Sequence, residues 1–115
     1  MNEDTLTTLE LLVFSIVGYA GEAKAHAYKA LTLSENGDFK GALEFIEKCD
    51  VSILKAHNFQ TTMIQKEASG EKIVLTMLFV HAQDHLMTAL SERDLIKKMI
   101  KQNERIYKLE KALNL

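Results

Sequence analysis

The sequence predicts an all-α protein: an antiparallel up-down-up bundle of three helices formed by one domain over residues 1–115. Three observations predict this class. The chain contains no proline and only five glycines, the two residue types that helix interiors tolerate least. Apolar residues recur at three- and four-residue spacing over long segments, as they do along a helix. Only two short polar stretches, each containing a glycine, interrupt this pattern, so consecutive helices must be antiparallel neighbours.

The first helix is expected over about residues 5–34. Its first half has apolar residues at helical spacing, namely Leu6, Leu9, Leu12, Val13, Ile16 and Val17. Gly18 and Gly21 follow within one turn, and a helix surface without side chains lets another backbone approach closely. We therefore expect both glycines to serve close helix packing. The helix should end at Asn36-Gly37, a pair typical of helix ends.

The second helix is expected over about residues 39–68, with Asp38 as its N-terminal cap. Its apolar residues alternate with lysines and glutamates at helical spacing: Phe39, Ala42, Leu43, Ile46, Cys49, Ile53, Ala56 and Met63. This pattern is typical of an amphipathic helix with one buried face. Gly70 should end this helix.

The third helix is expected over about residues 72–112, and it has two apolar faces. The face that should pack on the other helices contains Leu75, Phe79, Ala82, Leu86 and Leu90. A second face contains His81, Asp84, His85 and Thr88, flanked by Val74, Met77 and Leu78 before and by Leu95, Ile96 and Met99 after, with Glu92 interposed. Two partner helices cannot cover both faces, and a bare apolar patch drives association. We therefore expect a homo-oligomer in which the third helices meet near a symmetry axis.

Composition argues against several classes of function. The formal net charge is −2, with acidic and basic residues interspersed, which does not favour binding to nucleic acid or to an anionic membrane. The N-terminus lacks the basic start of a signal peptide, and the longest near-apolar runs are too short to span a bilayer. We therefore expect a cytoplasmic protein without direct membrane insertion. Cys49 is the only cysteine, so it cannot form an internal disulfide and should be a small buried thiol.

The polar residues of the second face leave three chemical interpretations open. Copies of Asp84 about 4 Å apart would repel by about 4 kcal/mol per pair at an effective dielectric of about 20, so such a cluster must take up protons or bind a hard cation such as Mg²⁺. His81 and His85, four residues apart, also suit zinc with Asp84 as a third ligand. Alternatively, His81 accepts a phosphoryl group on one ring nitrogen, with His85 as the nearest donor. Without such chemistry, these residues are hydrogen-bonded or solvated groups at an interface.

A nine-residue segment gives the chain a family resemblance. His81-Ala82-Gln83-Asp84-His85-Leu86-Met87-Thr88-Ala89 closely resembles the signature of the lactose/cellobiose-type (chitobiose-type) enzyme IIA of the bacterial phosphoenolpyruvate-dependent sugar phosphotransferase system. The resemblance covers essentially the whole chain. It extends to Arg93-Asp94-Leu95, Gly70-Glu71-Lys72, Ala56-His57 with Gln60-Thr61, Gly37-Asp38-Phe39, and Ala20-Gly21 with Ala23 and Ala30-Leu31.

The resemblance implies a homotrimer of three-helix subunits that serves as a phosphotransferase component. It implies that His81 carries phosphate on Nε2, and that Asp84 from three subunits surrounds one central metal ion, assigned as Mg²⁺. Phosphate would come from the histidine-containing phosphocarrier protein and pass to a cysteine of the sugar-specific IIB component. The membrane IIC component would then take up a β-linked disaccharide of the lactose, cellobiose or chitobiose class. Nothing around Cys49 resembles the IIB motif.

Two alternatives to a phosphoryl carrier remain at this level: a helical oligomeric metal-binding protein that holds zinc, and an adaptor whose third helix is only an assembly surface. We expect His57 to be packed or hydrogen-bonded and His26 to lie on a polar face. Gln83 should point away from His81 on the same helix and give that histidine no direct assistance.

Overall fold

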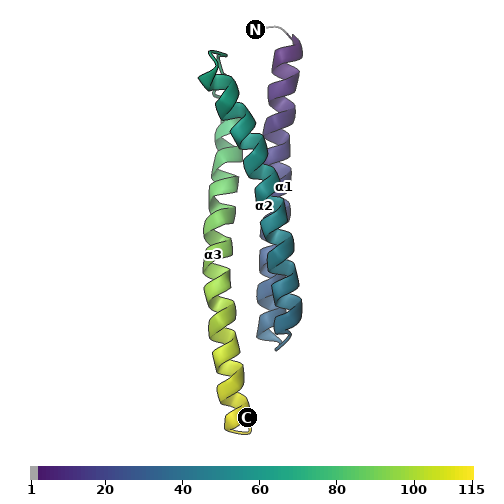
Figure 1. The fold of residues 1–115 in the computed structure, drawn as a ribbon, viewed down its shortest axis with the longest axis vertical. Helices are drawn as coiled ribbons and strands as arrows, with labels where there is room; N and C mark the ends of the chain where they lie inside the picture. Colours follow the sequence, from purple (N-terminus) through teal and green to yellow (C-terminus); the bar gives the residue numbers. More distant parts are fainter. Residues whose placement is uncertain (1–2) are drawn as a thin grey trace.

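The computed structural model describes residues 3–115, with side chains described from residue 8 onward. Its helices are α1 (Glu3–Glu35), α2 (Phe39–Ala68) and α3 (Met77–Ala112), and residues 3–115 contain no strand. None of the described helices combines the length and the apolar character needed to cross a bilayer. Successive helices run antiparallel (Figure 1), which confirms the predicted up-down-up bundle.

The connection between α1 and α2 is the tight turn that the sequence predicts. Gly37 has a φ of +85°, a left-handed conformation that glycine adopts without steric cost. The Asp38 N–H donates to the Leu33 carbonyl at 2.9 Å, which satisfies a carbonyl at the end of α1. The Asp38 carboxylate accepts from the Gly41 N–H at 2.9 Å and caps the start of α2. Local sequence therefore fixes both helix ends at this turn.

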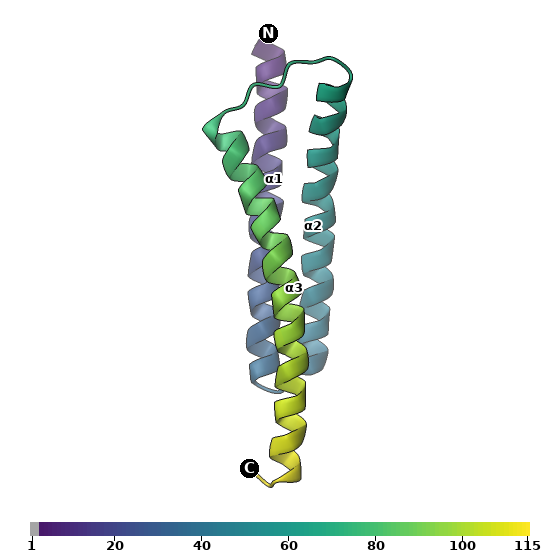
Figure 2. The same ribbon diagram turned by 90° about the vertical axis from the view of Figure 1, so that its left-hand side faces the viewer.

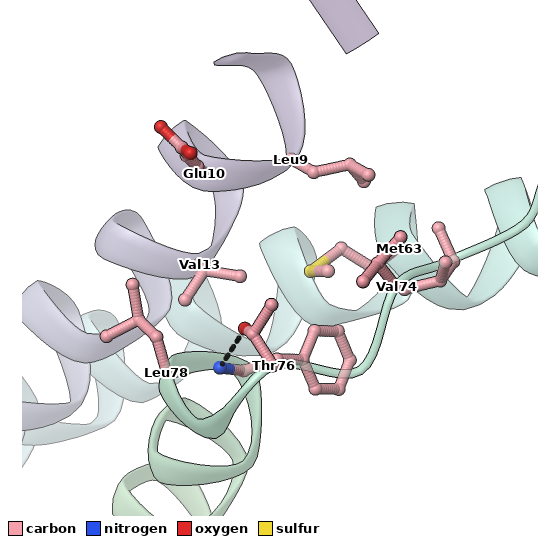
Figure 3. A pocket seen from close by; sticks show the side chains of 9 residues that line it. Leu9, Glu10, Val13, Met63, Val74, Thr76 and Leu78 are labelled. Atoms are coloured by element: carbon pink, nitrogen blue, oxygen red, sulfur yellow. Dashed lines mark hydrogen bonds between the residues drawn. The ribbon is translucent and has the colours of Figure 1, made fainter. Parts of the chain in front are cut away.

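The predicted start of the third helix at about residue 72 is wrong, because α3 begins only at Met77. Gly70, with a φ of +103°, follows the end of α2, and residues 71–76 then remain non-helical. Thr76 caps α3, since its hydroxyl accepts from the Phe79 N–H at 3.1 Å (Figure 3). Ile73, Val74 and Thr76 itself are β-branched, and such residues favour extended backbone over helix.

The segment between α2 and α3 closes one end of the bundle with apolar side chains. Ile73 is partly buried against the core. Leu9, Met63 and Val74 line a small, mainly apolar pocket of about 80 Å³ at this end (Figure 3). Leu75 is 73% exposed and precedes α3, so its predicted place on the buried face of the third helix is wrong.

The buried face of α3 otherwise agrees with the prediction. Ala82 and Leu86 are fully buried, and Phe79 and Leu90 are partly buried against the core. Ile96 is also buried, so its predicted place on the second apolar face is wrong. The reason is helical spacing: Ile96 lies two heptads after Ala82 and therefore on the same side of the helix.

Small side chains determine how closely the helices pack. Four buried alanines lie along the second half of α1: Ala20, Ala23, Ala27 and Ala30. Such residues let neighbouring helices approach closely. α1 makes its most extensive contacts with α2, whereas α3 packs more against α1 than against α2. The C-terminal end of α3 extends beyond the other two helices (Figures 1 and 2), and one face of α3 is left without a neighbour.

Candidate functional site

His81 lies in the second turn of α3, and its side chain is exposed. Met77, Leu78, Val80 and Asp84 line a shallow hollow beside it. The imidazole is thus accessible to a partner molecule, although most of its neighbours are apolar. This setting suits a nucleophile that exchanges a group with other proteins.

His85 lies one turn after His81 on the same side of α3. The two rings are stacked, with centroids 5.7 Å apart and an interplanar angle of 15°, as their four-residue spacing predicts. Burial lowers the pKa of His85 from its usual 6.5, and Lys24 and His81 lower it further, whereas Glu92 raises it. His85 is therefore neutral at neutral pH, with one ring nitrogen as donor and the other as acceptor.

Lys24, Glu92 and Tyr28, to which the sequence prediction gave no chemical role, form a polar network beside His85. Lys24 of α1 places its Nζ 3.1 Å from His85 Nδ1. The same Nζ lies 3.7 Å from Glu92 Oε2, and the Tyr28 hydroxyl donates to Glu92 Oε1 at 3.3 Å. Lys24 and Tyr28 are four residues apart on one face of α1, so that helix supplies both contacts. No local pattern connects residue 24 with residue 85, so this contact could not be predicted from the sequence.

Because Gly21 has no side chain, the His85 ring can pack closely against α1. A Cβ at residue 21 would lie 3.3 Å from His85 Nε2, closer than most Cβ contacts in proteins. The prediction that this glycine serves close packing is therefore confirmed. The same prediction is wrong for Gly18 within one chain, because a Cβ there would meet no described atom within 4 Å.

Asp84 lies on the exposed face with His81. The Thr88 hydroxyl donates to its backbone carbonyl at 2.8 Å, whereas its carboxylate has no hydrogen bond or ion pair with the described residues. A free carboxylate suits a hard cation, but one chain supplies only one such group. In the described part of the chain, no three His, Cys, Asp or Glu side chains are grouped to hold a metal ion. The alternative zinc site is thus not formed within one chain, where Lys24 already contacts Nδ1 of His85.

Below the polar residues, the exposed face of α3 is apolar. Leu95, Met99 and Ile106 are 59%, 45% and 51% exposed. Together with Met77, which is 83% exposed, we call them the α3 stripe. Helical spacing places all four on the side of α3 that carries Asp84. The stripe confirms Met77, Leu95 and Met99 of the predicted second apolar face, which one chain leaves uncovered. Val74 precedes α3, so its predicted place on this face is wrong.

The remaining histidines lie outside this site. His57 is exposed on α2 and makes no hydrogen bond or ion pair with described residues, so the prediction of a packed or hydrogen-bonded side chain is wrong. His26 is partly exposed and lies 3.7 Å from a carboxylate oxygen of Glu22, but its ring also packs on Phe45 with centroids 5.8 Å apart, so its predicted place on a polar face is only partly right.

Two further predictions concern Gln83 and Cys49. The Gln60 amide of α2 donates to Gln83 Oε1 at 2.7 Å, so the Gln83 side chain points towards α2 and away from His81, as predicted. Cys49 is fully buried, and burial raises the pKa of its thiol to about 11. A protonated buried thiol is not a nucleophile at neutral pH, and Cys49 is the structural residue that the sequence predicts.

Comparison with known proteins gives consistent matches over nearly the whole chain. A family model described as "PTS system, Lactose/Cellobiose specific IIA subunit" matches residues 11–104. The chain is 37% identical over 106 residues to the lichenan-specific phosphotransferase enzyme IIA component of Bacillus subtilis (strain 168), covering 92% of this chain and 93% of that relative. The crystal structure of the PTS cellobiose-specific enzyme IIA from Bacillus anthracis matches with a TM-score of 0.85 at 34% identity, covering 93% of this chain and 94% of that one. The IIA(Chitobiose)–HPr complex of the Escherichia coli phosphotransferase system contains a chain that matches with a TM-score of 0.72 at 32% identity, covering 86% of this chain and 96% of that one.

Proposed function

This chain belongs to the lactose/cellobiose-specific IIA family of the phosphotransferase system, and we propose that it carries a phosphoryl group on His81 Nε2. It is a phosphotransferase component that receives phosphate from the phosphocarrier protein HPr, which forms a complex with the chitobiose-specific relative. The observation that carries the assignment to His81 is its exposed ring stacked on the partly buried ring of His85. His57 is also exposed, but no histidine ring is stacked on it.

Transfer to His81 needs a free ring nitrogen and an open approach. The lone pair of His81 Nε2 forms a bond to phosphorus while the bond from phosphorus to the donor's imidazole nitrogen breaks, and the donor ring keeps that electron pair. His85 donates an N–H to the phosphoryl oxygens, because charge-assisted hydrogen bonds of this kind stabilise a transferring phosphoryl group. The exposed position of His81 leaves the side opposite the new bond open to the next acceptor.

The onward step completes the carrier cycle in the cytoplasm. A cysteine thiolate of the IIB component attacks phosphorus, and His81 Nε2 recovers the electron pair of the broken bond. The membrane IIC component then takes up a β-linked disaccharide of the lactose, cellobiose or chitobiose class. Relatives named for lichenan, lactose and cellobiose support a sugar-specific system of this kind.

A homotrimer around α3 completes the proposal. The uncovered α3 stripe and the unpaired Asp84 carboxylate support it. A three-fold axis along the stripe brings three copies of Asp84 together, where carboxylates about 4 Å apart repel by about 4 kcal/mol per pair at an effective dielectric of about 20. Oxygen ligands of this type fit Mg²⁺, which when bound neutralises the shared charge. The proposed role of the ion is therefore to stabilise the trimer.

The assignment to His81 is tested by phosphorylation with phosphoenolpyruvate, enzyme I and HPr. We expect an acid-labile, base-stable phosphate on the wild-type chain, as phosphohistidine gives. His81→Gln should abolish the label, and His57→Gln, which removes another exposed histidine, should retain it. Circular dichroism verifies that both variants keep the helical fold. Labelling that persists in His81→Gln, or that disappears in His57→Gln, would overturn the assignment.

A further inference from the structure

The contact between Lys24 and His85 determines which nitrogen of His85 carries the proton. The Lys24 Nζ lies 3.1 Å from His85 Nδ1. A lysine ammonium has three donors and no acceptor, so Nδ1 must accept this hydrogen bond. In the neutral ring, the proton then resides on Nε2.

The surroundings hold Lys24 in place. Glu92 Oε2 is buried and accepts no hydrogen bond from the described residues. The Lys24 ammonium, 3.7 Å away, is the charge that balances it. The Tyr28 hydroxyl donates to the other carboxylate oxygen at 3.3 Å and holds Glu92 towards α1. Because Lys24 is bound to both partners, its donor role towards His85 is fixed by the packing of α1 on α3.

The Nε2 edge of the His85 ring lies against α1 at Gly21. A Cβ there would lie 3.3 Å from Nε2, so the missing side chain preserves space beside the nitrogen that carries the proton. The ring also stacks on His81 with centroids 5.7 Å apart. The Nε2–H of His85 thus belongs to a ring that is stacked on the ring of His81, the proposed phosphate carrier.

We propose that Lys24 is a positioning residue that locks His85 in its Nε2–H tautomer, so that this N–H binds the phosphoryl group on His81. The proposal rests on the proposed function of His81, because it names how the neighbouring donor is prepared. Lys24 does not touch the phosphoryl group in this proposal and acts only through His85. The side chain at residue 24 must therefore be a permanent donor, a role that arginine also fills and methionine does not.

The tautomer is measured directly by ¹⁵N NMR of the His85 imidazole, without any phosphoryl donor. In the wild-type chain, we expect Nε2 to be protonated and Nδ1 to accept. Lys24→Met should give a mixture of tautomers, whereas Lys24→Arg should restore the wild-type signature. Lys29→Met, which removes an exposed lysine from the same helix, is the matched control and should leave His85 unchanged. A wild-type ring protonated on Nδ1, or an unchanged tautomer in Lys24→Met, would overturn the proposal.

A second measurement tests whether Lys24 acts through His85. If the two tautomers of His85 are equally populated, only half of the molecules present an Nε2–H to the phosphoryl group. Free rotation of the ring lowers this fraction further. The equilibrium constant for phosphorylation of His81 by HPr should therefore fall about two- to tenfold in Lys24→Met. In a His85→Gln background, the same substitution should have no further effect. An equal loss in both backgrounds would refute action through His85.

The NMR measurement and the labelling of His81→Gln distinguish a failure of this proposal from a failure of the proposed function. If His81 is not the phosphorylated residue, labelling of His81→Gln persists while the tautomer result is unaffected. If Lys24 does not set the tautomer, the NMR result fails while labelling still depends on His81.

Discussion

Replacing Leu95 by glutamate should dissociate the proposed trimer into monomers. Leu95 is 59% exposed in the single chain, and burying a fully exposed leucine side chain contributes about 1.5–3 kcal/mol. Burying the exposed part of Leu95 in the trimer therefore contributes about 1–2 kcal/mol per chain, or about 3–5 kcal/mol for three chains. Leu95→Glu removes this contribution to association. Three new carboxylates on helices that meet about 8 Å apart add about 2 kcal/mol of repulsion per pair at an effective dielectric of about 20. The combined effect is about 10 kcal/mol per trimer, which is comparable to the association free energy of a micromolar to nanomolar complex, about 8–12 kcal/mol.

Sedimentation equilibrium at micromolar concentration measures this effect. The wild-type chain should sediment as a trimer and Leu95→Glu as a monomer with an unchanged helical spectrum. Leu54→Glu is the matched control, because Leu54 of α2 is also 59% exposed but lies outside the α3 stripe. Lowering the pH through the range where glutamate takes up a proton should restore part of the association, since it removes the charge repulsion.

Three outcomes refute the reasoning about the α3 stripe. In the first, the wild-type chain is already monomeric. In the second, Leu95→Glu sediments as the wild type does. In the third, Leu54→Glu dissociates to the same extent, which would show that any added charge weakens the assembly.

The remaining predictions concern the metal, the core and the thiol. Asp84→Leu should abolish binding of one Mg²⁺ per trimer, measured by elemental analysis after dialysis, yet leave a trimer because apolar packing replaces carboxylate repulsion. Asp94→Leu, the control for the loss of a carboxylate, should still bind the ion. Metal that remains bound to Asp84→Leu would contradict the assignment. Leu86→Ala, at a fully buried position, should lower the free energy of unfolding by about 2–5 kcal/mol in urea titrations, through lost transfer energy and a new cavity; a change below about 1 kcal/mol would count against the described core. Alkylation of Cys49 at pH 8 should be much slower in the native chain than in urea, and it should accelerate as the pH approaches 11. The reason is that the raised pKa of about 11 keeps the native thiol protonated below that pH. Equal alkylation rates in the native and the unfolded chain would contradict the raised pKa of Cys49.

Local interactions made most of the helix boundaries predictable. Gly37 and Asp38 end α1 and start α2 through backbone conformation and capping within a few residues, so the pattern of residue types is sufficient. The start of α3 was mispredicted because the apolar residues after Gly70 fit a buried helix and an extended segment equally well by periodicity. Their packing against the end of the bundle, with Thr76 as the cap, decided between the two.

The residues of the candidate site likewise fall into those that local sequence predicts and those that it does not. Residue spacing alone predicts that His81, Asp84 and His85 share one side of a helix with an apolar stripe, because three- and four-residue spacing along a helix is a local property. The packing of α1 on α3 brought Lys24 and Gly21 to the His85 ring, since both lie more than sixty residues away from it in the chain. Contacts at that separation depend on how α1 and α3 pack, and helix packing follows from the shape of whole faces, which no single pair of residue types specifies. The shared face of the exposed histidine, Asp84 and His85 was therefore predictable from the sequence, whereas the Lys24 hydrogen bond to His85 was set by the packing of the bundle.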